Sequence, residues 1–193
     1  MTSALLRRAL ADSGVRALPD RAVTLLEKLK APPRLAAHLR LVHEVACHLT
    51  EWMTANHPAV KFDRTAVLFG AATHDIGKTI HLAELSGPGS LHERAGYELL
   101  LAHDVDDNLA RFARSHASWG AAVGVEDLLV SLADKIWKAK RVPDLEQLVV
   151  DRLAAASGRQ SWETFMALDD ELDRIAADAD HRLAFQASYP ITA

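Results

Sequence analysis

The chain has 193 residues, of which 49% are apolar and 25% charged, a balance typical of a globular protein with a full hydrophobic core. The net charge of −4, with histidine neutral, excludes a strongly basic surface, so we expect neither nucleic acid nor an acidic membrane as the main partner. A single cysteine excludes an intramolecular disulfide. Without a recognisable signal peptide or an apolar stretch long enough to cross a bilayer, the sequence favours a cytoplasmic protein.

Helical periodicity runs through nearly the whole chain, and we find no convincing strand. We therefore predict an all-α protein, a single-domain helical bundle over residues 1–193. The predicted helices, in chain order, cover about 3–11, 20–30 with Asp20 as N-cap, 33–53, 64–75, 91–103, 107–116, 126–140, 144–157 and 161–179, the last capped by Ser161.

The third of these helices has the clearest buried face. Its apolar residues alternate steps of four and three from Leu35 through Leu39 and Val42 to Met53. His43 flanks this face and can point inward, whereas we interpret His38 and His48 on the same helix as structural or surface residues. Cys47 is expected to be a buried thiol.

The next segments contain a helix exit, a loop and a helix start. Asp63 is the expected N-cap of a helix that ends at His74-Asp75, with Gly77 placed to terminate it. Residues 79–90 contain a Gly-Pro-Gly turn and are predicted to form a loop, a candidate lid. Ser90 and Glu93 have the spacing of a capping box at the start of the following helix.

The His74-Asp75 pair is the most informative feature of the chain. An imidazole and a carboxylate side by side at a helix exit can reach one metal ion. Further nitrogen and oxygen donors are spaced widely along the chain at His43, His92, His116 and Asp134, enough to hold one or two divalent transition metals. A lone histidine near an apolar face is more often a packed core residue, so the ordered set carries the hypothesis.

This ordered set resembles the HD-domain superfamily of metal-dependent phosphohydrolases. The resemblance covers about residues 35–140, through the segments LFGAATHDIGK at 68–78, HERAG at 92–96, Ser115-His116 and Ala133-Asp134-Lys135. The flanking helices, about 1–30 and 144–180, carry none of it.

The resemblance implies an all-helical core with metals held between helices. It implies that His43, His74, Asp75 and Asp134 bind a first metal. It further implies that Asp75 bridges to a second metal completed by His92 and His116. Two cations about 3.5–4 Å apart suit phosphoryl displacement, because they lower the pKa of a water and clamp the oxygens of the phosphate. The donors suit Fe, Mn, Zn, Co or Ni and do not choose among them.

Three cations are candidates for contact with a phosphate. They are Lys78, Arg94 and Lys135, each near a predicted metal ligand in sequence. For Lys78, a simple cation at a helix C-terminus is a nearly even alternative.

The function that we expect is hydrolysis of a phosphate ester, of a nucleotide or a related small molecule, by attack of a metal-bound hydroxide. Asp75 and Lys78 are the predicted catalytic residues. One alternative is a di-iron oxygenase of the HD-domain type, and the other is a non-catalytic module that senses metal or nucleotide. The substrate and the oligomeric state are not readable from the sequence.

Overall fold

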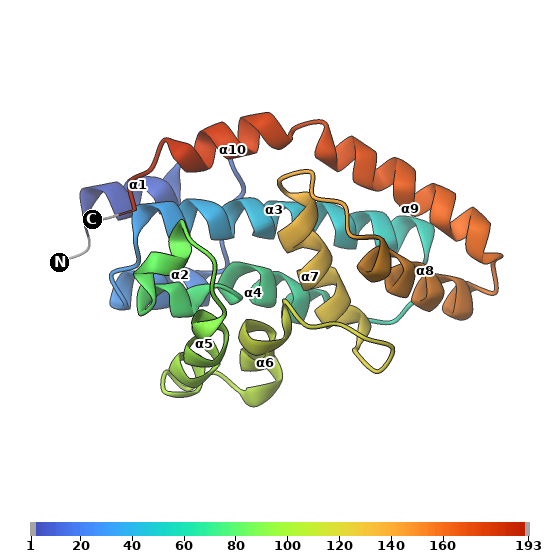
Figure 1. The fold of residues 1–193 in the computed structure, drawn as a ribbon, viewed down its shortest axis with the longest axis horizontal. Helices are drawn as coiled ribbons and strands as arrows, with labels where there is room; N and C mark the ends of the chain where they lie inside the picture. Colours follow the sequence, from blue (N-terminus) through green and yellow to red (C-terminus); the bar gives the residue numbers. More distant parts are fainter. Residues whose placement is uncertain (1–2, 192–193) are drawn as a thin grey trace.

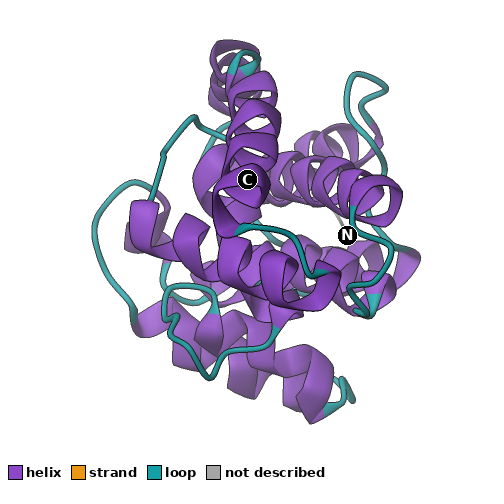
Figure 2. Cartoon of the chain, turned by 90° about the vertical axis from the view of Figure 1, so that its right-hand side faces the viewer, coloured by secondary structure: helices purple, strands orange, loops and turns teal. Residues whose placement is uncertain are grey.

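The computed structural model describes residues 3–191, which form ten α-helices and two short 3-10 helices without any strand (Figures 1 and 2). The all-α prediction is therefore confirmed; the first and last two residues of the expected 1–193 span lie outside the described part. The elements are α1 (Ala4–Ala11), α2 (Asp20–Lys28), α3 (Pro33–Asn56), α4 (Arg64–Thr73), η1 (Ile76–Thr79), η2 (Leu82–Leu85), α5 (Leu91–Leu101), α6 (Asp107–Ser115), α7 (Val125–Ile136), α8 (Pro143–Ser157), α9 (Ser161–Ala176) and α10 (Ala179–Ala187).

Helix α3 is the axis of the molecule, with α1, α4, α7 and α10 packed against it (Figure 1). Pro33 occupies its first turn, where a missing N–H costs nothing. Its side chains are buried on almost every face, including the guanidinium of Arg40. Arg40 Nη1 donates to Ala9 O at 2.8 Å and Nε to Arg16 O at 3.2 Å, so the buried charge fixes the N-terminal segment on α3.

Two apolar clusters meet along α3. One contains the second half of α3 with α7, α8 and α9, and the other joins the first half of α3 to α1, α2, α5 and α6. Helix α4 contributes to both, with Val67 and Ala71 in the first cluster and Phe69 and Ala72 in the second. The exit of α4 therefore lies between two packed bodies of side chains, which hold it rigidly.

Several predicted helix ends differ from the structure. Asp63 accepts from Ala66 N as expected, but Asp20 is the first residue of α2, after Pro19, and Gln160 precedes Ser161 as the cap of α9. Ser90 makes no side-chain capping bond, so the predicted capping box is not formed.

The C-terminal region and the predicted loop also differ. The final helix predicted over about 161–179 corresponds to α9, which ends at Ala176, and α10 is an additional helix that the sequence does not predict. Arg182 reaches back from α10 and donates to Ile175 O in the last turn of α9. The segment 79–90, predicted as a loop, contains η2, and Gly77 lies inside η1, which ends where that segment begins, rather than at a helix end.

No helix within residues 3–191 is long and apolar enough to span a membrane.

Candidate metal centre

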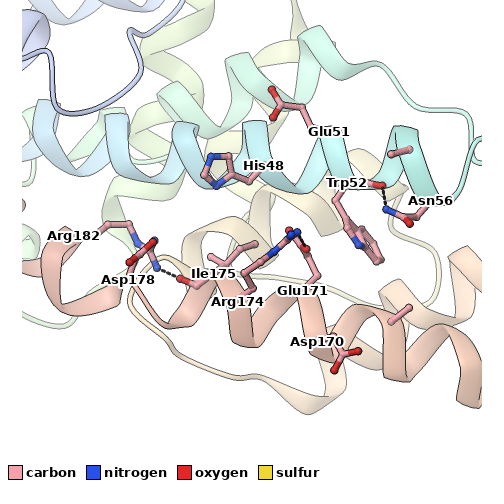
Figure 3. Close-up of a pocket in the computed structure, with 12 residues that line it drawn as sticks. His48, Glu51, Trp52, Asn56, Asp170, Glu171, Arg174, Ile175, Asp178 and Arg182 are labelled. Carbon is pink, nitrogen blue, oxygen red and sulfur yellow. Dashed lines mark hydrogen bonds and ion pairs between the residues drawn. The ribbon is translucent and has the colours of Figure 1, made fainter.

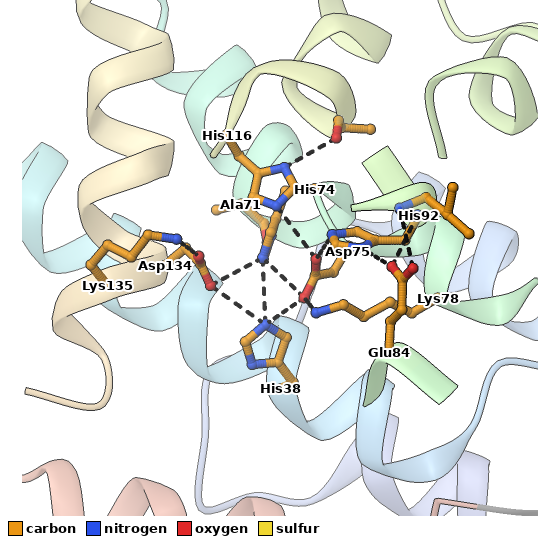
Figure 4. Close-up of polar contacts among 12 residues, drawn as sticks. His38, Ala71, His74, Asp75, Lys78, Glu84, His92, His116, Asp134 and Lys135 are labelled. Carbon is orange, nitrogen blue, oxygen red and sulfur yellow. Dashed lines mark hydrogen bonds and ion pairs between the residues drawn. The ribbon is translucent and has the colours of Figure 1, made fainter. Parts of the chain in front are cut away.

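His74 and Asp75 are placed by the end of α4. His74 is the C-cap residue, and its Nδ1 lies 3.0 Å from Ala71 O, so the ring donates through Nδ1 and leaves Nε2 available. Asp75 follows at the start of η1, with only 2% of its surface exposed. Figure 4 shows its carboxylate at the centre of the polar cluster, with imidazoles on both sides.

Three side chains gather at one oxygen of Asp75. Two histidines face the oxygen itself, and an aspartate lies beside those two histidines. His38 Nε2 from α3 is 3.1 Å from Asp75 Oδ2, and His74 Nε2 is 3.6 Å from the same oxygen. Asp134 Oδ1 from α7 is 3.4 Å from His74 Nε2 and 3.8 Å from His38 Nε2. This first subsite therefore joins α3, α4 and α7.

Two further imidazoles face the other oxygen. His92 Nε2 from α5 is 3.0 Å from Asp75 Oδ1, and His116 Nε2, at the end of α6, is 3.5 Å from it. His116 Nδ1 lies 3.0 Å from Ala113 O, and His92 Nδ1 lies 2.5 Å from Glu84 Oε2. Both rings thus donate through Nδ1 and turn Nε2 toward Asp75, forming a second subsite that shares the Asp75 carboxylate with the first.

The donor set fits divalent metal ions. Neighbouring ligands about 2.1 Å from a metal are about 3.0 Å apart in an octahedron and about 3.4 Å apart in a tetrahedron, close to the spacings here. Three overlapping groups within the described residues have ligand atoms within 4.8 Å of one another: His38–His74–Asp75, His74–His116–Asp134 and Asp75–His92–His116. Asp75 Oδ1 and His92 Nε2 are buried and lack a hydrogen-bonding partner despite their 3.0 Å approach, as expected of two atoms that face a common cation.

The charge states of Asp75, His38 and His116 also suit a cation. Burial would raise the pKa of Asp75, but the charge of His74 and the close imidazoles of His38 and His92 hold it well below its usual range. Burial lowers the pKa of His38, and it lowers that of His116 to about 4 together with the charge of His74. Ionised carboxylates and neutral imidazoles are the forms that bind metals.

The structure corrects the prediction for His43. His43 is buried, but its Nε2 lies 3.8 Å from Cys47 Sγ and it is not part of the cluster. His38, interpreted from the sequence as structural or surface, takes the place assigned to His43. Five residues on an α-helix correspond to about 140° of rotation and about 7.5 Å of rise, so only one of the two can face Asp75. The other predicted ligands, His74, Asp75, His92, His116 and Asp134, are brought together.

The three candidate cations separate into two kinds. Lys78 Nζ donates to Asp75 Oδ2 and Lys135 Nζ to Asp134 Oδ2, both at 2.6 Å. Arg94 instead points into solvent with 88% of its side chain exposed and pairs with Glu98 on α5. Arg94 therefore lies outside the site, whereas both lysines border it.

A cavity of about 330 Å³ opens onto the cluster. Its polar walls include His38, Asp75, Lys78, Glu84 and Lys138, and its apolar walls include Leu85, Trp137 and Leu183. A larger groove of about 860 Å³ lies between α3 and α9 and contains no member of the cluster (Figure 3). The buried Glu171 of this groove already pairs with Arg174. The smaller cavity is lined by His38 and Asp75, so it is the one linked to the candidate chemistry.

Sequence reasoning missed His38 and Glu84. His38 lies three residues after Leu35 and four before Val42, so the apolar periodicity places it inward as well as it places His43. Glu84 lies in the segment predicted as a loop, and no periodic signal marked it.

Comparisons with known proteins agree with this architecture. The HD domain family matches residues 35–184. The tRNA (cytidine(56)-2'-O)-methyltransferase of Picrophilus torridus is 25% identical over 146 residues, covering 67% of this chain and 39% of the relative. The chain thus spans well under half the length of that relative, and no solved structure matches. The family match extends from α3, the helix that carries His38, to α10. The chain therefore belongs to the HD domain family, whose superfamily is one of metal-dependent hydrolases.

Proposed function

We propose that this protein is a metal-dependent phosphohydrolase that cleaves a small phosphate ester, of a nucleotide or a related molecule. The observation that carries the proposal is the shared carboxylate of Asp75. One of its oxygens faces His38 and His74 and the other faces His92 and His116, next to a cavity bordered by lysine. A bridging carboxylate with imidazoles on both sides is suited to two divalent cations.

The residues divide between two subsites. His38, His74 and Asp134 would hold one ion with Asp75, and His92 and His116 would complete the other. When bound, two such cations polarise a phosphoryl oxygen and lower the pKa of a water. The donor set, four imidazoles and two carboxylates, suits Fe, Mn, Zn, Co or Ni.

The cavity supplies contacts for the substrate. Lys78 and Lys138 place positive charge at its wall, which favours a phosphate group over a neutral ligand. Trp137, Leu85 and Leu183 offer apolar surface for the rest of the molecule, and Gln186 from α10 offers an amide. Its volume is near the lower end of the range of about 300–1,000 Å³ for small-molecule sites, which favours one small substrate over a polymer.

The Picrophilus relative does not extend the proposal to methyl transfer. The methyltransferase activity belongs to a protein of which only 39% is matched, and the match does not show which part performs that activity. The clustered donors of this chain support the hydrolytic proposal instead.

Phosphate release tests the proposal. The purified protein is incubated with nucleotides, sugar phosphates and an aryl phosphate, with Mn²⁺ added or removed by chelation. We expect metal-dependent release from at least one ester, and loss of both turnover and most bound metal in Asp75→Asn. With metal bound but no ester cleaved, the proposal fails. Iron-dependent oxygen consumption would then support the oxygenase alternative, and nucleotide binding without turnover would support a sensor.

A further inference from the structure

Glu84 has an unusual set of contacts for a residue in a surface segment. Its Oε2 lies 2.5 Å from His92 Nδ1 and accepts from His92 N at 3.1 Å, and its Oε1 accepts from Leu91 N at 3.1 Å. Its side chain is only 8% exposed. Figure 4 shows the Glu84 carboxylate beside the edge of the His92 ring that faces away from Asp75.

The contacts give Glu84 two tasks. The bonds from Leu91 N and His92 N satisfy the first free amides of α5, the task that Ser90 was predicted to perform. The contact with His92 Nδ1 fixes the ring so that Nε2 faces Asp75 Oδ1 at 3.0 Å. One carboxylate therefore sets both the start of the helix and the direction of the imidazole.

The position of Glu84 is itself constrained by close packing. A Cβ at Gly89 would lie 2.3 Å from Glu84 Oε1 and 2.5 Å from its Cδ, so a side chain there would displace Glu84 from its present position. Leu85 and Gly87, from the same segment, line the cavity beside the cluster. The 82–89 segment is thus held on α5 through Glu84, and the cavity wall and His92 are parts of one contact network.

We propose that Glu84 is a positioning residue for the second subsite, acting through His92 to make that subsite competent to bind its cation. The inference rests on the two-cation centre proposed above. Carboxylates that hold the far nitrogen of a metal-binding histidine fix its tautomer and strengthen it as a ligand. Glu84 belongs to none of the groups with ligand spacing, so it acts on the metal only through His92.

Metal titration of the full-length apoprotein tests the proposal without reference to turnover. Mn²⁺ is titrated by calorimetry into wild type, Glu84→Ala and Glu84→Gln. We expect two equivalents in wild type and an unchanged first equivalent in Glu84→Ala, with the second weakened by about 10- to 100-fold, the usual cost of losing such a partner. Glu84→Gln keeps an acceptor of the same size, and we expect a smaller loss.

A matched control separates positioning from general loss of a carboxylate. Glu98 lies on α5, is exposed and accepts a side-chain hydrogen bond from Arg94, so Glu98→Ala should bind both equivalents normally. In the apoprotein, NMR of the imidazole N–H should also show a hydrogen-bonded His92 Nδ1 proton in wild type and Glu98→Ala that is absent in Glu84→Ala.

Three results would overturn the inference: a second equivalent in Glu84→Ala as tight as in wild type, an equal weakening of both equivalents, or only one equivalent in wild type. If Glu84→Ala does not fold, Glu84→Gln decides, and wild-type affinity for the second equivalent would contradict the proposal. A wild-type protein that binds both equivalents but cleaves no ester would count against the proposed function, while the difference in metal affinity would still support the role of Glu84.

Discussion

His38 Nε2 and Asp75 Oδ2 meet at 3.1 Å between α3 and the exit of α4, in a region where both side chains are less than 10% exposed. The ring of His38 also packs edge-on against Trp137 at 5.0 Å between centroids, which fixes it from the side of α7. His38 Nδ1 has no hydrogen-bonding partner, so the ring is oriented by its packing on Trp137 and by the contacts of Nε2 with Asp75 and His74.

We predict that His38→Ala loses the first cation and His43→Ala keeps it. His38 contributes a ligand atom to the cluster, whereas His43, on the same helix, contacts Cys47 instead. The loss in His38→Ala should exceed the roughly 10- to 100-fold expected for an outer hydrogen-bonding partner. Metal content after dialysis, measured by mass spectrometry, checks both variants, and equal metal loss in the two would contradict the assignment.

His38 and His43 show how much of the site can be predicted from the sequence. The ligands at 74, 75, 92, 116 and 134 are marked by local motifs, and the helices around them follow from periodicity. The first histidine has no such motif, and both candidates on α3 satisfy the apolar period. Choosing between them needs the rotation and depth of α3 against α4, which are set by packing of residues distant in sequence. Glu84 was missed for a related reason, because its role depends on how the 82–89 segment folds back onto α5.

Gly77 is predicted to be intolerant of any side chain. A Cβ there would lie 2.0 Å from His92 O and 2.6 Å from Gly96 N, both backbone atoms that cannot rotate away. Gly77→Ala should therefore push η1 from α5, cost about 1–3 kcal/mol of unfolding free energy as overpacking does, and separate Asp75 from His92. Urea denaturation and Mn²⁺ titration measure the two effects.

Gly120→Ala is the matched control for this prediction. A Cβ at Gly120 would meet nothing within 4 Å, so the added methyl should leave metal binding unchanged and stability unchanged or slightly higher. If Gly77→Ala behaved in the same way, the close packing of η1 on α5 would not be needed to assemble the site.

The lowered pKa of His43 predicts a specific dependence of the unfolding free energy on pH. Burial first, and then the charges of Arg16, Arg64 and Arg40, lower its folded-state pKa to about 4. With an unfolded-state pKa near the usual ~6.5, the unfolded chain binds the proton first as the pH falls. Stability from neutral His43 is therefore present above pH ~6.5 and is lost as the pH falls toward 4, amounting to about 3 kcal/mol.

The difference between wild type and His43→Leu isolates this group. Unfolding free energies of the two apoproteins are measured by denaturant titration at several pH values between 7.5 and 4. All other titrating groups contribute to both proteins. The unfolding free energy of wild type should therefore fall relative to that of His43→Leu as the pH is lowered. A gap that stays constant across this range would show that His43 titrates normally in the folded protein.

Lys78→Ala is predicted to impair catalysis without removing metal. Lys78 Nζ donates to Asp75 Oδ2 and lines the cavity, but it is a cation and supplies no ligand to the metal. Removing Lys78 takes away one charge-assisted contact with the phosphate of the proposed substrate, worth about 1.5–3 kcal/mol. The value of kcat/KM for the best ester should therefore fall by about 10- to 100-fold. Arg94→Ala, at an exposed side chain paired with Glu98, should leave kcat/KM unchanged. Because Lys78 competes with a cation for Asp75, metal should bind its variant at least as tightly as wild type. Loss of metal from Lys78→Ala would instead mean that the lysine holds Asp75 in place.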